Sequence, residues 1–195
     1  ISSVFIVPSV TFFAASIMYR ARKPLLSGAR SSEISTNRLD VLKRFNEQSG
    51  GKCSVAEIEY SIVNPGAEKD ILKYCEGNRI GVLIRGPLAQ GIASGRFNRD
   101  TVFTDSIRVR YNKGGIDRQK FERQLDLLEA LKKKLGCGDN MAELAMRYVI
   151  SHEAGPTAIP GATSPSQVAA NAKAADNLLS PSQLAVIRDT IEECL

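Results

Sequence analysis

The sequence predicts an α/β fold in which parallel strands alternate with surrounding helices. Apolar residues recur at helical spacing in several segments, and short strand-like segments lie between them, which is the pattern of parallel β-α units. Residues 80–84 (IGVLI) form a continuous apolar run, typical of a strand buried on both faces. With 43% hydrophobic and 24% charged residues, the composition is that of a globular domain and not of a disordered chain.

The remaining elements follow from apolar spacing and from the placement of Ser, Gly, Pro and Asn. Before the apolar run they are a loop over 24–36, a helix capped by Thr36 or Asn37 and ended by residues 49–51, a strand over 52–63 and a helix over 67–76. After it they are a loop over 85–115, helices over 116–135 and 141–151, a short strand at 158–159, and helices that start at Ser164 and Ser180. Three strands are fewer than a complete (β/α)₈ barrel of roughly 250 residues requires, so we expect part of the fold to be missing.

The first segment is apolar from Val4 to Met18 and is followed by the basic residues Arg20, Arg22 and Lys23. It is shorter than the roughly 20 residues of a membrane-spanning helix, and a secretory signal carries its positive charge before the apolar stretch. We therefore expect no membrane span. A buried strand or helix, a targeting remnant and non-native sequence all stay open. The sequence does not begin with Met, which indicates a fragment, a processed form or an incomplete gene product.

Charge and cysteine content exclude several classes of protein. The net charge of +5 comes with basic clusters, such as residues 132–134, that have no interleaved aromatic residues, so we expect no nucleic-acid partner. The four cysteines form no C-x-x-C pair, and His152 is the only histidine, so no metal site is expected. Reduced, mostly buried thiols indicate a cytoplasmic protein. His152 itself is interpreted as a cation at a helix end or a surface residue.

Two loops stand where ligands bind in parallel β-α folds. Residues 85–97 (RGPLAQGIASGRF) follow the buried strand, and their glycines allow a close backbone approach to a ligand. Residues 159–171 (IPGATSPSQVAAN) lead from a short strand into a capped helix, whose free amides favour an anion. Taken alone, the first also fits an ordinary Gly-Pro turn with a solvated arginine, and the second a plain helix cap.

Taken together, the two loops resemble the last two strand-to-helix segments of the aldo-keto reductases. Residues 81–88 (GVLIRGPL) and Gly91 fit the family pattern G-V-I-A-x-x-P-L-x-x-G-x-L-T-G-K-[FY], and residues 159–171 fit I-P-G-x-x-x-P-x-x-x-x-x-N. Residues 59–61 (EYS) and 34–37 (ISTN) resemble two further family segments in the right order. The resemblance runs from about Ile34 to the C-terminus and leaves residues 1–33 unassigned.

The resemblance implies the C-terminal, cofactor-binding half of a TIM (β/α)₈ barrel over residues 34–195. The first loop would hold the pyrophosphate of NADP(H), with Arg85 against the nicotinamide. The second loop and its helix would hold the adenosine 2′-phosphate and the adenine, while Ser35 and Glu57 face the carboxamide. The residues expected to bind the cofactor are Ser35, Glu57, Arg85, Gly86, Pro87, Leu88, Gln90, Gly91, Gly161, Thr163, Ser164, Gln167 and Asn171.

The sequence departs from the family at several of these positions. Glu57 replaces the usual glutamine, and Thr163 and Gln167 stand where many members have Lys or Arg. The catalytic Asp, Tyr, Lys and His of the family come from the first four strands, and nothing before Ile34 resembles those segments, so no catalytic residue is assigned. The complete protein is expected to reduce aldehydes or ketones with NADP(H). The alternative is a non-enzymatic half-barrel that binds a nucleotide or a partner, including another copy of itself through exposed sheet edges.

Overall fold

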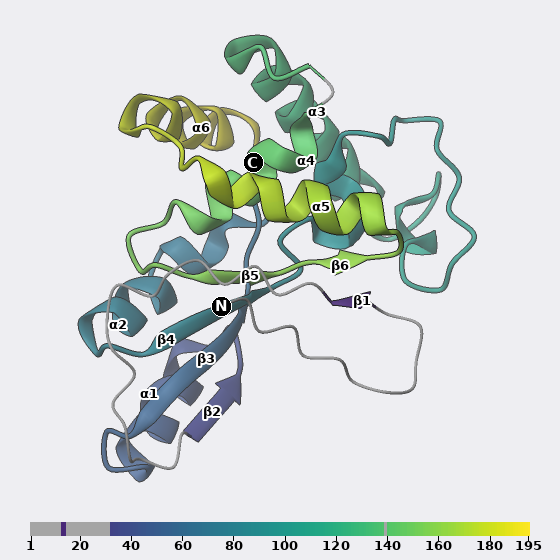
Figure 1. The fold of residues 1–195 in the computed structure, drawn as a ribbon. Helices are drawn as coiled ribbons and strands as arrows, with labels where there is room; N and C mark the ends of the chain where they lie inside the picture. Colours follow the sequence, from purple (N-terminus) through teal and green to yellow (C-terminus); the bar gives the residue numbers. More distant parts are fainter. Residues whose placement is uncertain (1–12, 15–31, 139) are drawn as a thin grey trace.

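The protein is described by a computed structural model, which covers residues 13–14, 32–138 and 140–195. Its centre is a parallel sheet with strand order β2-β3-β4-β5 (Figure 1). These strands are β2 (Ser32–Ser35), β3 (Cys53–Glu59), β4 (Gly81–Arg85) and β5 (Thr157–Ile159). Each strand pairs in parallel with the next one along the chain, and helices form the crossovers, so the predicted α/β fold is confirmed.

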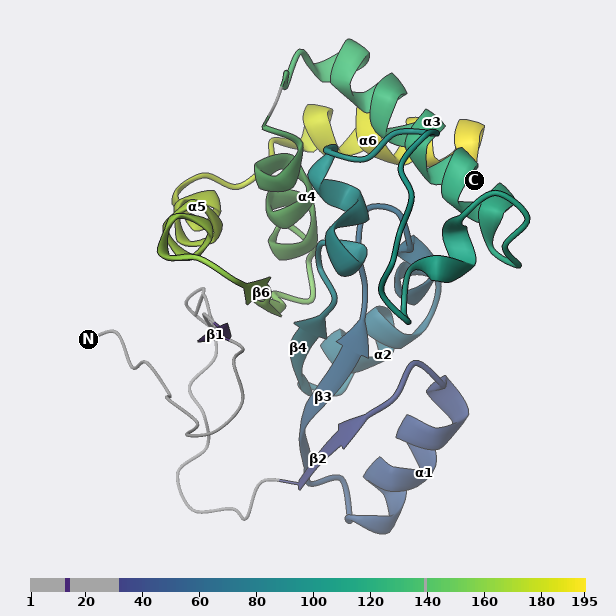
Figure 2. The same ribbon diagram turned by 90° about the vertical axis from the view of Figure 1, so that its right-hand side faces the viewer.

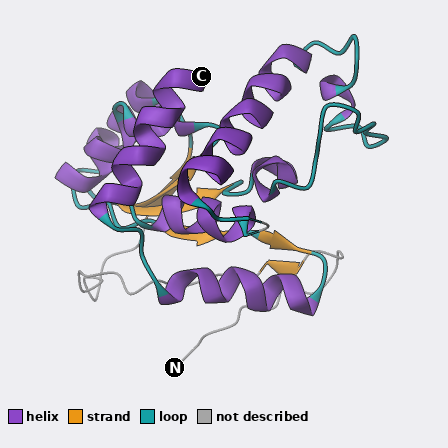
Figure 3. Cartoon of the chain, turned by 90° about the horizontal axis from the view of Figure 1, so that it is seen from above, coloured by secondary structure: helices purple, strands orange, loops and turns teal. Residues whose placement is uncertain are grey.

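Helices and short 3₁₀ segments occupy the connections. The α-helices are α1 (Leu39–Gln48), α2 (Ile71–Gly77), α3 (Arg118–Leu135), α4 (Met141–Ile150), α5 (Pro165–Lys173) and α6 (Pro181–Cys194). The 3₁₀ segments are η1 (Pro65–Glu68), η2 (Ala89–Ser94), η3 (Val109–Tyr111) and η4 (Ala174–Asp176). The stretch between η2 and α3, which includes η3, projects from the body of the molecule (Figures 1 and 3).

A second, two-stranded sheet joins distant parts of the chain. β1 (Phe13–Ala14) pairs antiparallel with β6 (Gly161–Ala162). The rest of the apolar segment 4–18 and the basic residues after it lie outside the described residues. Within the described residues, no helix has the length and apolarity needed to cross a bilayer.

The two faces of the parallel sheet differ because successive strand residues point to opposite sides. Ile58, Ile84 and Ala158 are register neighbours and are fully buried. Helices α1 and α2 lie on one side of strands β2 to β4 (Figure 2). On the opposite face, Glu57 and Leu83 are register neighbours and only half-buried. Among the described residues, the sheet is thus packed closely on one face.

The helical core follows the predicted apolar spacing. Phe121, Leu128 and Leu131 of α3 are buried, as are Leu144 and Val149 of α4. Burial of a large aliphatic or aromatic side chain contributes about 1.5–3 kcal/mol. The stripe of α3 faces α6 and the 3₁₀ segments η2 and η3, whereas α4 packs against β5 and η2, so burial of these side chains stabilises the helical layer.

Strand β2 corrects the prediction of a loop over 24–36. Ser32 to Ser35 pair in parallel with β3, and Ile34 lies opposite Ala56. This segment has one apolar residue in four and no strand-like alternation, so its strand conformation comes from pairing with the long neighbour β3. Tertiary pairing here overrides weak local preference.

The predicted helix over 67–76 is divided into two elements. The 3₁₀ turn η1 ends at Glu68, and α2 begins only at Ile71, after Asp70 with φ −147°. Glu68 is therefore not part of helix α2. Its carboxylate is free to turn toward the helices that cover the sheet.

Glu68 accepts hydrogen bonds from two buried tyrosines. The hydroxyls of Tyr60 and Tyr148 both donate to Glu68 Oε1, and Arg188 Nε lies 3.8 Å from Glu68 Oε2. Burial raises the pKa of both phenols, which keeps them protonated as donors. The network links the end of β3, η1, α4 and α6, four segments that are distant in sequence.

The four cysteines are free thiols. Cys53 and Cys75 are buried, while Cys137 and Cys194 are half-buried. Burial raises the pKa of Cys75 to about 12. Since the thiolate is the reactive form, Cys75 is a core residue and a poor nucleophile at neutral pH.

His152 is not the helix-end cation that the sequence suggested. It lies two residues beyond α4, its ring is edge-on to Tyr60 with centroids 6.1 Å apart, and its Nδ1 accepts a hydrogen bond from the Ala154 amide. Burial lowers the pKa of the imidazole below its ordinary value of 6.5. Folding therefore favours the neutral ring.

This burial predicts a pH dependence of stability. The unfolded chain binds a proton at His152 more readily than the folded one, so stability falls as the pH drops below about 6.5. Urea unfolding at about pH 7.5 and pH 5.5 should show a smaller loss for His152→Gln than for the wild type. An equal loss in both proteins would show that carboxylates alone cause the dependence.

Candidate cofactor-binding site

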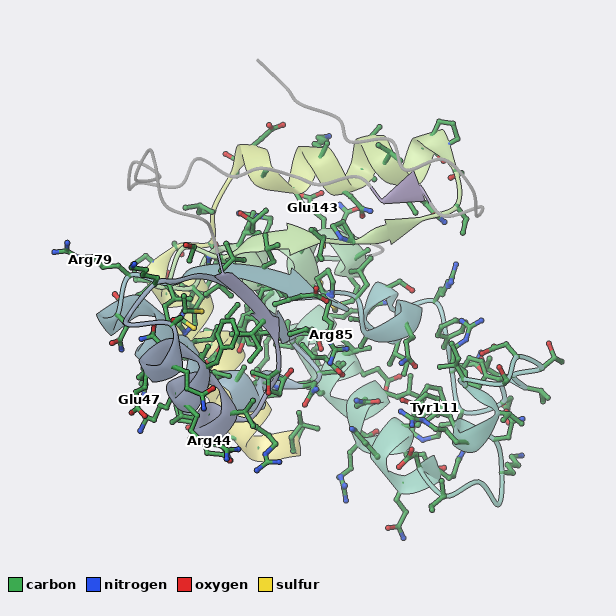
Figure 4. The ribbon with its side chains drawn as sticks, turned by 90° about the horizontal axis from the view of Figure 1, so that it is seen from below. Arg44, Glu47, Arg79, Arg85, Tyr111 and Glu143 are labelled. Atoms are coloured by element: carbon green, nitrogen blue, oxygen red, sulfur yellow. The ribbon has the colours of Figure 1, made fainter. Side chains whose placement is uncertain are left out.

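Parallel pairing places the ends of β3, β4 and β5 at one edge of the sheet. Glu59, Arg85 and Ile159 are the last residues of these strands and lie opposite one another in register. Arg85 stands at this edge, on the side of the projecting segment that carries Tyr111 (Figure 4). Its guanidinium lies 3.0 Å from Glu59 Oε2 and 3.9 Å from Glu57 Oε1. The strand-end group therefore consists of one cation between two carboxylates, all half-exposed.

The Asn37 side chain connects the segment after β2 to the end of β3 through two hydrogen bonds, an arrangement called here the Asn37 clamp. Its side chain accepts a hydrogen bond from the Glu59 amide at 2.8 Å and donates one to the Glu59 carbonyl at 2.7 Å. The prediction that Thr36 or Asn37 caps α1 is therefore wrong. The residue before α1 is Arg38, which makes no side-chain cap, and the Thr36 hydroxyl accepts from the Arg38 amide instead.

A polar hollow of about 360 Å³ opens beside this clamp. Its lining residues come from the ends of β3 and β4 and from the segments after β2 and β3, and they are Asn37, Glu59, Asn64, Gly66, Ala67, Asp70 and Arg85. Asn64 Nδ2 donates to Glu59 Oε1 at 3.3 Å, opposite the oxygen that pairs with Arg85. The Glu59 carboxylate is thereby held on both sides.

The loop after β4 has an unusual backbone. Gly86, Ala89, Gln90 and Gly91 all have positive φ, at 64°, 47°, 59° and 88°. The Ala89 amide donates to the Gly86 carbonyl and the Gly91 amide to the Leu88 carbonyl, which fold the loop into consecutive tight turns. Positive φ costs about 1–3 kcal/mol at a residue other than glycine, and such strain concentrates at ligand sites.

Two arginines beside this loop were not predicted as binding residues. An added Cβ on Gly91 would lie 3.0 Å from Arg96 Nη2, and Arg108 Nη1 donates to the Gln90 carbonyl at 3.4 Å. Both guanidiniums lie against the Phe97 ring, with Cζ 4.9 and 5.4 Å from its centroid. Arg96 stands at the basic position of the G-K-[FY] pattern, so the sequence could have indicated it as a binding residue. No motif in the sequence indicates Arg108.

The second loop leads from β5 through β6 into α5. Ser164 is the N-cap, and its Oγ accepts from the Gln167 amide. Gln167 Oε1 accepts from the amide and the hydroxyl of Thr163, at 2.7 and 3.1 Å. One turn after Gln167, Asn171 is 6% exposed, and its Nδ2 has no hydrogen-bond partner among the residues that the structure describes.

An unpaired amide donor in the interior is costly, at about 1–3 kcal/mol. Asn171 is thus a buried donor in need of an acceptor, in the last turn of α5 and away from the free amides of the first turn. Gly161, Thr163 and Gln167 are exposed, and Ser164 is half-buried. The residues that lead into α5 are therefore accessible, whereas Asn171 further along the helix is buried.

The structure arranges the predicted cofactor residues as three groups. Ser35 lies opposite Glu57 in register, and Glu57 lies beside Arg85. Gly86, Pro87, Leu88, Gln90 and Gly91 form the strained turns after β4. Gly161, Thr163, Ser164 and Gln167 surround the start of α5, and Asn171 lies in its last turn. Pro87 is buried and so shapes its loop from the inside. The first two groups are contiguous, whereas the third follows the neighbouring strand β5.

The fold consists of parallel β-α units that carry polar side chains and glycine turns at the carboxyl ends of the strands. This arrangement defines the (β/α)₈-barrel type, and the described residues contain four of its strands. The chain belongs to the aldo/keto reductase family, whose model matches residues 29–192. The recognition made from the two loop motifs is therefore confirmed.

Individual relatives agree with this assignment. The chain is 28% identical over 145 residues to the NADH-specific methylglyoxal reductase of Escherichia coli, an alignment that covers 73% of this chain and 43% of that protein. A glycerol dehydrogenase from Gluconobacter oxydans superposes with a TM-score of 0.68 at 26% identity, over 85% of this chain and 50% of that one. An aldo/keto reductase from Klebsiella pneumoniae in complex with NADP and acetate gives 0.56 at 27% identity, over 82% and 47%. The chain thus spans about half the length of these relatives.

The Asn37 clamp predicts a loss of stability on substitution. Asn37→Ala removes two hydrogen bonds to Glu59, each worth about 1 kcal/mol, and should lower the free energy of urea unfolding by about 2 kcal/mol. Asn78→Ala is the control, because that exposed amide makes a single bond to the Tyr74 carbonyl. If both variants lose the same free energy, the clamp does not hold the strand end.

Proposed function

We propose that this chain is the cofactor-binding half of a nicotinamide-dependent aldo-keto reductase, spanning residues 34–195. The observation that carries the proposal is the buried Nδ2 of Asn171 in α5, which has no hydrogen-bond partner among the described residues. A dinucleotide places hydrogen-bond acceptors on its adenine, and such a ligand would satisfy this donor.

The glycine turns after β4 support the same ligand. Because Gly91 has no side chain, a ligand can approach its backbone beside Arg96, where an added Cβ would be crowded. Arg96 brings positive charge to that loop, whereas Arg108 beside it is ion-paired with Asp105 at 2.8 Å, so the cation that favours a pyrophosphate there is Arg96. The residues present therefore fit a dinucleotide at both loops.

Arg85 is proposed to lie against the nicotinamide, with Ser35 and Glu57 toward its carboxamide. A planar guanidinium stacks well on an aromatic ring, and Glu59 holds Arg85 in position at 3.0 Å. When bound, such a cofactor supplies the hydride for carbonyl reduction. We assign no catalytic residue to this chain, so reduction of aldehydes and ketones to alcohols is proposed for a complete protein that also contains the family's first four strands.

A second candidate function rests on the packing of the sheet. Parallel sheets are normally covered on both faces, yet Glu57, Leu83 and Thr157 share a half-buried face that the described helices do not cover closely. A non-enzymatic half-barrel that binds a partner, or a second copy of itself, would cover this face. Sedimentation of the purified chain across a concentration series tests whether this face binds a second copy, and a chain that stays monomeric at all concentrations would contradict self-association.

Binding of a reduced dinucleotide tests the leading proposal. The chain contains no tryptophan, so the fluorescence of NADH or NADPH can be followed without interference. We expect a saturable change with at least one of them, and no aldehyde reduction by the chain alone. Absence of saturation with both would contradict the proposal.

Gly91→Ala should weaken this binding by about 10-fold or more, since it adds a methyl group beside Arg96 at a position with φ +88°. Gly114→Ala is the matched control, because Gly114 has φ +79° but nothing within 4 Å of an added Cβ. Both variants carry similar backbone strain. Equal affinities in the two variants would show that the loop after β4 does not contact the cofactor.

A further inference from the structure

The exposed aliphatic side chains of this protein are concentrated in the projecting segment between η2 and α3. Among the described residues, six large apolar side chains are exposed, and four of them lie within residues 102–116. These four are Val102 (76% exposed), Ile107 (57%), Val109 (48%) and Ile116 (92%). A single exposed apolar residue needs no explanation, but several on one segment are typical of an interaction surface.

The segment has an aromatic core of its own, which leaves these aliphatic side chains outside. The rings of Phe103, Tyr111 and Phe121 pack together with centroids 5.5 to 6.1 Å apart, and all three are buried. Asn112 Nδ2 donates to the Phe103 carbonyl at 2.8 Å, and Asn112 Oδ1 accepts from the Phe103 amide at 2.8 Å. The exposed side chains are therefore carried by an internally packed segment.

Further bonds bring two of the apolar positions together. The Asp117 amide donates to the Arg110 carbonyl at 3.1 Å, which places Ile116 and Asp117 beside Val109 and Arg110. Arg110 Nε also lies 3.1 Å from Asp117 Oδ2. A surface that is ordered before its partner arrives loses less conformational entropy on binding.

The charges around these side chains are unbalanced. Residues 96–126 contain eight Arg or Lys and five Asp or Glu, which gives a net charge of +3. All five carboxylates are ion-paired with an Arg or Lys of the same stretch. Arg96, Lys120 and Arg123 are exposed and form no ion pair with the described residues. The charge left unmatched on this surface is therefore positive.

This charge decides between the kinds of partner. A second copy would bring a net charge of +3 against +3, which disfavours self-association through the segment. An anionic surface is attracted, over a distance of about 10 Å at 0.1 M salt. Aliphatic side chains on a projecting segment (Figures 1 and 3) can enter the acyl boundary of a bilayer, whereas a protein partner must supply a matching groove.

We infer that residues 102–116 dock this protein on an anionic membrane surface. The four aliphatic side chains lie at the acyl boundary, and the unmatched cations lie among the lipid headgroups. The contact is peripheral, and it does not depend on the proposed cofactor function.

Co-sedimentation of the full chain with lipid vesicles tests this inference. We expect binding to equimolar phosphatidylserine and phosphatidylcholine, and at least about 10-fold weaker binding to phosphatidylcholine alone. Binding should be lost at about 1 M salt, where the Debye length is about 3 Å. Equal binding to both kinds of vesicle, or binding to neither, would overturn the inference. Binding to soluble polyglutamate without binding to vesicles would also overturn it and would indicate an acidic protein partner.

A paired variant examines the aliphatic side chains. Val102→Ser combined with Ile116→Ser removes the two most exposed of them and should weaken vesicle binding about 10-fold or more. Leu178→Ser combined with Leu195→Ser is the control, because these exposed leucines lie outside the segment. Equal weakening by the two pairs would overturn the assignment of residues 102–116.

A second pair examines the cations. Lys120→Gln combined with Arg123→Gln should reduce the preference for phosphatidylserine about 10-fold. Lys69→Gln combined with Lys73→Gln removes the same charge from exposed positions at α2 and should leave the preference unchanged. If both pairs reduce the preference equally, net charge alone causes the binding and the inference fails.

Discussion

Parallel pairing of β3 with β4, and of β4 with β5, is the constraint on which every proposed contact depends. Because parallel strands end at the same edge, it brings Glu59, Arg85 and Ile159 into one row and starts both ligand loops from that row. The loop after β4 and the helix after β5 are separated by about 70 residues of chain, yet they follow adjacent strands. A change in the register of β4 would displace Arg85 from Glu59 and separate the loops from each other.

The packed elements of the fold hold loop and helix residues in conformations that are energetically unfavourable on their own. Ala89 and Gln90 hold positive φ without being glycine, and Asn171 keeps a buried donor unpaired. Such features persist only where the surrounding structure over-determines them. Here α4 supplies that support, because it packs against both η2 and α5. Ligand binding would satisfy the unpaired donor and so recover part of the cost.

Much of this could be predicted from the sequence, because it depends on local patterns. The apolar run of β4, the stripes of α3 and α4, and the starts of α5 and α6 follow from residue spacing and caps. β2 could not be predicted, since a short polar strand is stabilised by its neighbour. The role of Asn37 is also non-local, because its partner lies 22 residues away. Gln167 and Gln183 have identical preceding residues, yet Gln167 accepts from Thr163 and Gln183 from Ser180, so only the structure distinguishes their hydrogen bonds.

The two loops at the strand ends are proposed to form one cofactor site, and hydrogen–deuterium exchange with and without a reduced nicotinamide dinucleotide can show whether they do. We expect slower exchange over residues 86–92 and 163–171 together, with exchange in α1 and α2 unchanged. Protection of one loop alone, or equal protection throughout the chain, would contradict a single site built from both loops.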